Sequence, residues 1–263
     1  MTLRVAIEGV SFWASRLPGW DIARAVMRGE QAPPEAASAR PSPTLLAPTE
    51  RRRAPDTVAV ALEVAARACE AAGRKPSDLP SVFASTHGDL AISDYMCSTL
   101  AATPTLISPI KFHNSVHNAA AGYWSIGTGS LAPYTAISSY EYTFGEGLVE
   151  AATQVVCEQR PVLYVAFDIE SKGALATMAP SRGLLGAALV LAPVSQLQQR
   201  GLILTTESVA ECQPTPARSA AAPLVADNAL APCLPFFEVL ASSNPRTLSL
   251  ALGRQMALNV QVN

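Results

Sequence analysis

The sequence predicts an α/β fold in which helices pack on a central sheet. Two continuous apolar runs, PVLYVAFDIE (161–170) and GLLGAALVLAPV (183–194), are typical of buried strands. Residues 56–73 instead show the apolar spacing of a helix. Strands that alternate with helices along a chain favour a layered α/β architecture.

The first part of the chain supplies several of these elements. Residues 3–13 alternate as a strand, and residues 31–49 hold five of the 21 prolines, which indicates a loop. The helix at 56–73 has Asp56 as a candidate N-cap and ends at Gly73. A strand follows near 81–86 and runs into a loop, and residues 90–102 are predicted to be helical.

The second part is predicted in the same way. The stretch NSVHNAAAGYWSIGTG (114–129) is rich in small residues and suits a closely packed helix. Residues 134–152 indicate a strand at 134–140 that turns directly into a helix reaching about Gln159. Residues 210–235 carry five prolines and indicate a linker or meandering arm, and the alternation in 246–262 predicts a β-hairpin that turns at Gly253 and Arg254.

Composition limits the function classes. The chain has 263 residues, 49% hydrophobic and 15% charged, with a formal net charge of −2, which suits one large or two small domains and argues against nucleic acid as a partner. The basic run Arg51–Arg53 is interpreted as a solvated helix lead-in, with a phosphate or nucleic-acid patch as the alternative. The apolar start is short and broken by Glu8, so we expect a strand, not a signal peptide, and no segment approaches the ~20 apolar residues of a membrane span. The five cysteines, an odd number without close pairing, favour a reducing cytoplasm.

Four short motifs resemble functional sites, but none of them is complete enough to predict a chemical activity. GTGSLA (127–132) lacks the third glycine of a dinucleotide loop, and GYWSIG (122–127) misses a nucleophile elbow by one residue. His113 and His117 lie four residues apart but lack a nearby third ligand, so no metal site is expected. Asp168 ends a buried strand, where function often resides, but a turn or cap role is favoured.

The strand-to-helix turn at 138–142 raises the sharpest question. A helix N-terminus favours negative charge, and tight turns of this kind often present a nucleophilic Cys or Ser. This turn offers Ser138, Ser139, Tyr140, Glu141 and Tyr142. Glu141 can be read as an ordinary acidic residue of a first helical turn or as the occupant of a former nucleophile position.

Residues 108–152 resemble the β-ketoacyl synthase family, the condensing enzymes of thiolase fold. SPIKFHNSVHNAAAG (108–122) resembles the loop and Asn-x-x-x-Gly helix start that precede the family's nucleophile, with Asn118 and Gly122 at the matching positions. Gly129 and Pro133 match the family's Gly-Leu-x-Gly-Pro turn, although Ala132 replaces its second glycine. The family places its catalytic cysteine eight residues after this proline, where the present chain has Glu141.

The resemblance implies a thiolase-like half fold, with helices on a mixed central sheet and a C-terminal β-hairpin. It divides the chain into a synthase N-terminal-like half, 1–200, and an extension with linker and hairpin, 201–263. A carboxylate at Glu141 cannot form the acyl thioester that condensation requires. The family's second half supplies two catalytic histidines, whereas His87, His113 and His117 all lie in the first half here. No catalytic residue, metal or cofactor is therefore expected.

A silent relative has a known use in this family. Chain-length factors of type II polyketide and aryl polyene systems pair with an active ketosynthase and bound its acyl tunnel. The resemblance implies such a subunit in polyketide, aryl polyene or fatty acid-like biosynthesis, with a full-length ketosynthase and an acyl carrier protein as partners. A malonyl-carrier-protein decarboxylase that uses Glu141, and a homodimeric scaffold, are the alternatives.

The family also suggests an interface. Its strand before the elbow, here 134–140, pairs antiparallel with the same strand of the partner across a two-fold axis. Ile110, Phe112, Tyr140 and Tyr142 are then expected at the interface, close to the partner's tunnel. The alternative is that these aromatic and aliphatic side chains are ordinary core residues.

Overall fold

The computed structural model describes residues 1–194, 200–242 and 245–263. The strands are β1 (Thr2–Ala14), β2 (Leu17–Pro18), β3 (Ser81–Ala84), β4 (Tyr134–Ile137), β5 (Val162–Asp168), β6 (Leu185–Ala192), β7 (Arg200–Ser208), β8 (Arg246–Gly253) and β9 (Met256–Val262). The α-helices are α1 (Trp20–Met27), α2 (Pro48–Arg53), α3 (Asp56–Ala72), α4 (Leu90–Ala102), α5 (Pro109–Asn114), α6 (Ala119–Thr128), α7 (Thr143–Glu158), α8 (Ala222–Val225) and α9 (Leu234–Ala241). Short 3₁₀ turns are η1 (Pro76–Asp78), η2 (Pro104–Leu106), η3 (Tyr140–Tyr142), η4 (Ala174–Thr177) and η5 (Ala231–Cys233).

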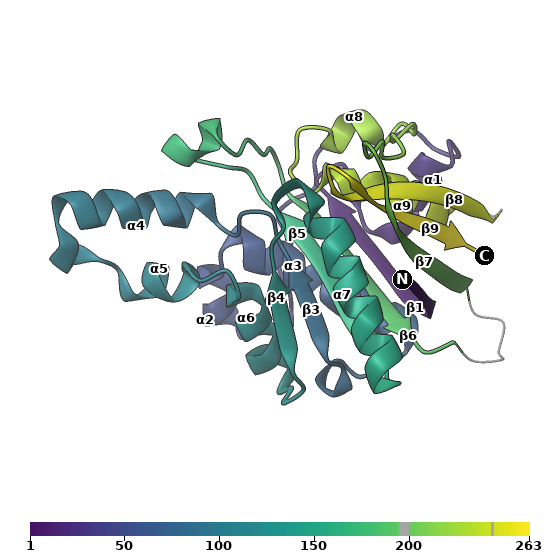
Figure 1. Cartoon of the computed structure of the whole chain (residues 1–263). Coiled ribbons are helices and arrows are strands. Elements are labelled where there is room, and N and C mark those ends of the chain that lie inside the picture. Colours follow the sequence, from purple (N-terminus) through teal and green to yellow (C-terminus); the bar gives the residue numbers. More distant parts are fainter. Residues whose placement is uncertain (195–199, 243–244) are drawn as a thin grey trace.

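All described strands belong to one mixed sheet (Figure 1). Its order is β4-β3-β5-β6-β1-β7-β9-β8, with β2 paired to β1. β3 runs parallel to both of its neighbours, β4 and β5, whereas each successive pair from β5 through β6, β1, β7 and β9 to β8 is antiparallel. The strands predicted near 3–10, 81–86, 134–140, 161–168 and 187–193 therefore share one sheet, as expected.

Helices cover both faces of this sheet and form two hydrophobic clusters. Along β5, Tyr164 faces the cluster with α7 and α9, whereas Val165 faces the cluster with α3 and α6. This alternation is the period of two that any strand imposes on its side chains. Because both faces are covered, β5 and β6 are buried along their whole length, which explains their continuous apolar sequences.

The helix predicted at 56–73 is α3, and Gly73 ends it in the left-handed conformation at φ 62°. The predicted N-cap is wrong by one residue. Pro55 occupies the cap position, and Asp56 is the first helical residue. The Asp56 carboxylate pairs instead with the Arg40 guanidinium at 2.6 Å, so its charge still lies at the positive end of the helix.

The C-terminal part extends the same sheet. The predicted hairpin is confirmed as β8 and β9, which are joined through Arg254 and Gln255. β7 pairs with β1 on one side and with β9 on the other, so the sheet is continuous past residue 200. The division into 1–200 and 201–263 stays a prediction.

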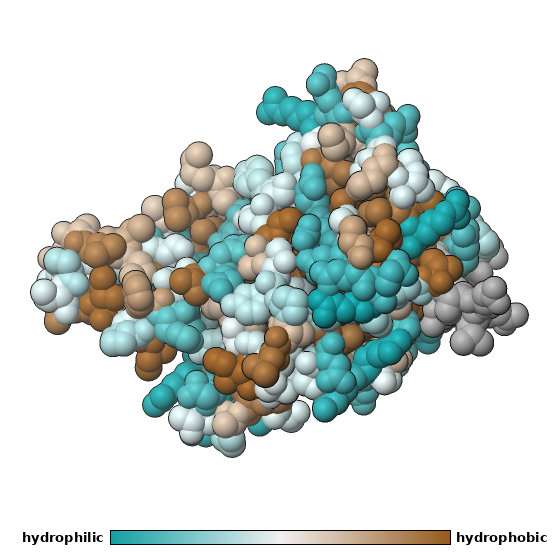
Figure 2. Space-filling view, turned by 60° about the horizontal axis from the view of Figure 1, so that its bottom comes forward, coloured by the Kyte–Doolittle hydropathy of each residue, from teal (hydrophilic) through white to brown (hydrophobic). Residues whose placement is uncertain are grey.

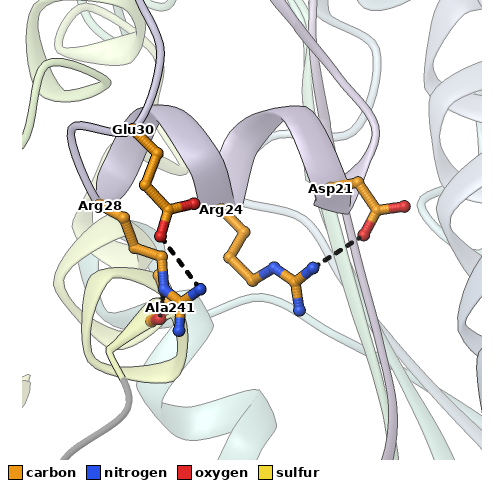
Figure 3. A network of polar contacts seen from close by, with 5 residues as sticks. All are labelled: Asp21, Arg24, Arg28, Glu30 and Ala241. Carbon is orange, nitrogen blue, oxygen red and sulfur yellow. Dashed lines mark hydrogen bonds and ion pairs between the residues drawn. The ribbon is translucent and has the colours of Figure 1, made fainter.

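The segment 210–235 is largely irregular, as expected of a meandering arm, but it leads into α9, which the sequence reading missed. α9 packs against α1, and Arg28 donates a hydrogen bond from Nε to the carbonyl of Ala241 at 2.6 Å (Figure 3). Arg28 also pairs with Glu30 at 3.3 Å, and Arg24 pairs with Asp21 at 3.4 Å on the adjacent turn. Of these contacts, the hydrogen bond from Arg28 to Ala241 joins the end of α1 to the end of α9, and the two ion pairs are local to α1 and the residues that follow it.

One part of the chain leaves the body of the fold. Helices α4 and α5, with η2 between them, project from the sheet as an arm, residues 90–114 (Figure 1). In α4 only Ile92 is buried, and in α5 only Asn114 is buried. Figure 2 shows hydrophobic residues at the surface of this arm.

Among the described residues, no helix is both long and apolar enough to cross a membrane.

Candidate functional site

Strand β4 forms one edge of the sheet and pairs in parallel with β3 alone among the described strands. It is shorter than the predicted 134–140 and ends at Ile137. Beyond Ile137 the chain turns, and Tyr140 adopts φ 50°, a left-handed conformation that is uncommon for residues other than glycine. Ser138 instead donates its hydroxyl to the Thr86 carbonyl at 2.9 Å.

The opposite edge of the sheet, strand β8, is covered by another segment of the chain. Beyond β8, the Thr215 N–H donates to the Ser249 carbonyl at 2.8 Å, and the Ser249 N–H donates to Thr215 Oγ1 at 2.9 Å. The segment around Thr215 therefore covers that edge. Unpaired edges invite association with another chain, so β4 is the edge at which a partner strand could add.

Glu141 lies in η3, directly before α7, with its side chain exposed. The turn is held by Thr143, whose Oγ1 accepts from the Ser139 N–H at 2.9 Å and donates to the Tyr140 carbonyl at 2.6 Å. A hydrogen bond with Glu141 raises the pKa of the Tyr142 hydroxyl.

A cleft of about 770 Å³ opens beside Glu141. Four segments form its walls, namely the start of α7, residues 211–217, the residues around η5, and the tip of the β8–β9 hairpin. Pro214, Pro216, Pro232 and Pro235 line it, together with Phe144 and Leu250. Charged side chains among the lining residues are Glu141, Glu211 and Arg254, and none of the three histidines contributes among the residues that the structure describes.

Asp168 lies at the carboxyl end of β5 and is 1% exposed. Its carboxylate accepts hydrogen bonds from the Ser85 hydroxyl at 2.8 Å, the Thr86 N–H at 2.9 Å and the Thr86 hydroxyl at 2.6 Å. Burial raises the pKa of Asp168, while the bonds from Thr86 and Ser85 act in the opposite direction. Asp168 thus has a structural role. It is not the predicted cap of a local turn, because its carboxylate at the end of β5 binds Ser85 and Thr86, which follow the neighbouring strand β3.

The loop that Asp168 holds is connected to two other segments. The Ser85 carbonyl lies 2.8 Å from His117 Nε2, and the Thr86 carbonyl accepts from Ser138. These bonds tie the end of β3, the residues after α5 and the residues before the Glu141 turn to one another. The base of the arm and the elbow are therefore fixed to a common buried carboxylate.

The four residues predicted at an interface do not form one cluster. Ile110 and Phe112 are exposed on α5, which packs against α4. Tyr140 is exposed in η3, 6.3 Å from the His87 ring, and Tyr142 lines the cleft. The interpretation of Ile110, Phe112 and Tyr140 as core residues is wrong for this chain alone, because each is at least 47% exposed.

Other exposed apolar side chains were missed by the sequence reading. They are Leu100 and Leu106 on the arm, Val116 directly after it, Ile126 on α6, and Leu131 and Tyr134 where β4 begins. Leu131 is 100% exposed and Leu106 is 70% exposed. The low polarity of 99–110, TLAATPTLISPI with no charge before Lys111, is the signal that could have shown this surface.

The motif residues occupy the places that a helix start and a turn require. Asn118 is the N-cap of α6, and its side-chain amide donates to the Tyr134 hydroxyl at 3.1 Å. Gly129 ends α6 at φ 67°, and the Pro133 carbonyl accepts from the Ser81 N–H at 3.1 Å as β4 begins. A Cβ on Gly122 would meet no described atom within 4 Å, so packing within this chain does not demand glycine there.

The two histidines do not share a helix face. α5 ends at Asn114, so His117 lies beyond the helix that carries His113. His113 stacks edge-on against the Tyr123 ring at 5.7 Å. In the described part of the chain, no group of three His, Cys, Asp or Glu side chains could hold a metal ion.

Comparison with known proteins matches residues 25–234 to the family described as β-ketoacyl synthase, N-terminal domain. No curated protein matches the chain. A chain of the ketosynthase (ApeO) in complex with its chain length factor (ApeC) from Xenorhabdus doucetiae is 21% identical, with a TM-score of 0.75 over 98% of this chain and 99% of that one.

Two further solved structures are similar over the whole chain. The ishigamide ketosynthase/chain length factor gives a TM-score of 0.70 at 14% identity, covering 99% of both chains. The type II polyketide synthase complex AntDE:AntF, an acyl-carrier protein with its ketosynthase, gives 0.74 at 11% identity, again covering 99% of both chains. At these identities the likeness establishes the fold, the thiolase-like arrangement expected from the sequence.

Proposed function

We propose that this chain, which belongs to the β-ketoacyl synthase N-terminal domain family, is a non-catalytic, chain-length-factor-like subunit that dimerises with a ketosynthase. Structures of that kind of complex are among its whole-length structural relatives. The proposal extends to a role in shaping the partner's acyl tunnel. It places the protein in the cytoplasm, in polyketide, aryl polyene or fatty acid-like biosynthesis.

The main support for the proposal is that β4 pairs on one side only among the described strands and lies next to the apolar arm. Leu106, Ile110 and Phe112 expose apolar surface on the arm, and Leu131 and Tyr134 do so where β4 begins. Because α4 and α5 have one buried residue each, packing against the rest of the chain gives this helix pair little stability. Exposed apolar surface of this kind marks a site of protein association.

Glu141 supports the non-catalytic part of the proposal. It lies in the turn before α7, the position that the family resemblance matches to the nucleophile, and a carboxylate there forms no acyl thioester. No histidine among the described residues lines the adjoining cleft. The groups that would donate hydrogen bonds to a developing enolate in the family are thus not assembled beside Glu141.

The malonyl decarboxylase alternative is less well supported by the same cleft. Its charged lining contains two carboxylates, Glu141 and Glu211, against one guanidinium, Arg254. A malonyl carboxylate entering there would be repelled by like charges. Decarboxylation by the isolated chain that is lost in Glu141→Ala would reverse this order of preference.

Strand pairing can be tested at a single backbone N–H. The Ser81 N–H donates to the Pro133 carbonyl and the Ser85 N–H donates to the Ile137 carbonyl. In a parallel ladder this register turns the N–H of Thr135 and Ile137 toward β3 and that of Ala136 away from it. Ala136→Pro therefore removes a donor only from the bare side of β4, and edge strands tolerate proline.

The experiment is co-expression with a full-length ketosynthase, followed by size-exclusion chromatography. We expect the unaltered chain to co-elute with the ketosynthase, and Ala136→Pro to remain folded but elute alone. Met256→Asp is the matched surface control, because Met256 is exposed on β9, far along the sheet from β4. Retained co-elution of Ala136→Pro would refute strand pairing, and a stable homodimer that ignores the ketosynthase would favour a scaffold.

The tunnel role concerns the arm. Phe112 is 61% exposed on α5, which leaves its ring available to a partner. In a reconstituted pair supplied with an acyl carrier protein, Phe112→Ala is expected to change the length distribution of the products. An unchanged distribution from an intact pair would remove the tunnel role and leave dimerisation standing.

A further inference from the structure

A separate hollow lies on the surface where helices α1 and α9 meet strand β8. Its volume of about 650 Å³ is within the range of roughly 300–1,000 Å³ that ligand pockets occupy. Three arginines line it, namely Arg28 at the end of α1, Arg218 in the irregular segment before α8, and Arg246 at the start of β8. Three segments distant in sequence thus bring positive charges together, and like charges gathered in this way are stabilised by a bound anion.

Two carboxylates also line the hollow, and each already accepts hydrogen bonds from the chain. The Ser219 N–H donates to Glu238 Oε1 at 2.7 Å, and the Arg218 N–H donates to both Glu238 oxygens at 2.9 and 3.0 Å. Glu30 Oε1 pairs with Arg28 Nη1 at 3.3 Å, and the two side chains lie against each other in Figure 3. The two negative charges are therefore partly compensated before any ligand enters.

The guanidinium groups that remain suit an oxyanion. Arg218 and Arg246 are exposed, and neither forms an ion pair with a carboxylate of the described residues. A guanidinium binds phosphate-like oxyanions through two parallel N–H donors. Arg28 donates from Nε to the Ala241 carbonyl at 2.6 Å, which holds its guanidinium at the end of α9. The Ser219 hydroxyl also lines the hollow and can add a further donor.

The carboxylates distinguish one oxyanion from another. Glu30 Oε2 accepts no hydrogen bond from the residues that the structure describes. Sulfate carries only acceptor oxygens at neutral pH, so this carboxylate repels it. Inorganic phosphate keeps a P–OH group at neutral pH, and an O–H that donates to a carboxylate forms a strong, charge-assisted hydrogen bond. A lining of arginines and carboxylates therefore favours phosphate over sulfate.

We propose that this hollow binds inorganic phosphate, with Arg218 and Arg246 donating to its oxygens and Glu30 accepting from its P–OH group. The inference does not depend on the proposed pairing with a ketosynthase, because β8 and β4 lie at opposite ends of the sheet. Binding can therefore be measured on the isolated chain.

The experiment compares three oxyanions. Sodium phosphate, sodium sulfate and phenyl phosphate are titrated separately into the full chain by isothermal calorimetry at neutral pH and constant ionic strength. Phenyl phosphate is mainly a dianion at neutral pH, so it carries the phosphate oxygens without a P–OH donor. We expect saturable phosphate binding, with sulfate and phenyl phosphate weaker by about tenfold because both lack the donor to Glu30. Equal or tighter binding of either, or no saturable phosphate binding, would overturn the proposal.

Two variants locate the site. Arg218→Gln and Arg246→Gln are each expected to weaken phosphate binding by about tenfold, because each removes a charged donor. Arg52→Gln is the matched control, since Arg52 is an exposed arginine of α2 that does not line the hollow. Circular dichroism verifies that each variant is folded. Phosphate binding that is unchanged in both hollow variants, or weakened equally by Arg52→Gln, would contradict the assignment.

A further pair of variants tests the selectivity. Glu30→Gln removes the negative charge and adds N–H donors, so the preference for phosphate over sulfate should fall about tenfold. Asp21→Asn is its control, because Asp21 lies on the same helix outside the hollow and pairs with Arg24 (Figure 3). A preference that Glu30→Gln leaves unchanged, or that Asp21→Asn lowers equally, would refute the role proposed for the Glu30 carboxylate.

Discussion

Asp168 shows at the scale of single residues how one buried carboxylate positions the features on which function depends. It accepts bonds from Ser85 and Thr86, and these two residues contact His117 and Ser138 through their carbonyl groups. The arm and the elbow are therefore positioned through the same loop. The sequence indicated Asp168 as the end of a strand, but only the pairing of β3 with β5 brings its partners within reach.

We predict that Asp168→Asn destabilises the fold by about 1–3 kcal/mol, measured by urea unfolding at pH 7. An amide keeps the shape of the carboxylate but turns an N–H₂ group toward some of the hydroxyl and N–H donors. Asp227→Asn is the control, because the Asp227 side chain is exposed and its ion pair with Arg182 is long, at 3.9 Å. Equal stability of the two variants would show that the buried bonds contribute nothing.

The pH dependence of this difference has a definite sign. Burial raises the pKa of Asp168 in the folded chain above its ordinary value. The resulting contribution to stability is present below the unfolded pKa and is lost as the pH rises through the folded pKa. The difference in free energy of unfolding between the unaltered chain and Asp168→Asn should therefore become larger as the pH falls through the raised pKa of Asp168.

At the scale of elements, the sequence was most informative where periodicity and a terminating residue agreed. α3 has helical spacing and ends at Gly73, and the β8–β9 hairpin alternates on both sides of its turn. α1 and α9 were missed, since each has eight residues and α9 is apolar on almost every side. β7 was not predicted, since the proline argument covered only 210–235, and the place of β7 in the sheet depends on pairing with β1 and β9.

The missed helix α9 contributes to the main hydrophobic core. Phe237 is fully buried, with its ring 5.2 Å from Phe12, 5.9 Å from Trp20 and 6.0 Å from Phe144. We predict that Phe237→Ala lowers the free energy of unfolding by about 3–5 kcal/mol, because a cavity replaces these contacts. Urea unfolding followed by far-UV circular dichroism measures the change.

Phe112→Ala is the matched control for that experiment. Phe112 is exposed on the arm, so the same substitution there should change the stability of the isolated chain by about 0.5 kcal/mol or less. A small effect of Phe237→Ala would mean that residues 201–263 are a loosely attached extension. A large effect would show that α9 is part of the hydrophobic core that stabilises the whole fold.

At the scale of the whole molecule, the two ends of the sheet differ. One end finishes in β8, which the Thr215 segment covers, and the other finishes in β4, which has the arm beside it. Through the family resemblance, the sequence predicted the turn before α7 and a strand before it, and the interface role of that strand stays a prediction. It could not show how much of the arm is exposed, because exposure depends on which segments fold back over it, as the η4 segment does where the Ala174 N–H donates to Asp94.

Two exposed cysteines can be used to test whether a partner covers the arm and the β4 edge. Cys97 lies on α4 in the arm and Cys157 lies near the end of α7, and both are exposed. Cys69 and Cys233 are buried, and burial raises the pKa of the Cys69 thiol to about 12 and that of Cys233 further. Because the thiolate is the reactive form, the two buried thiols should resist alkylation in the folded chain.

We predict that pairing with a ketosynthase protects Cys97 and leaves Cys157 reactive. Iodoacetamide labelling of the purified pair, read by mass spectrometry of this chain's own peptides, separates the sites from cysteines of the partner. The isolated chain should be labelled at both positions, since neither thiol is covered. Protection of Cys97 alone would place the partner over the arm and the β4 edge. Protection of Cys157 alone in an intact pair would move the interface to the α7 side of the sheet, and the role proposed for the arm would then fail.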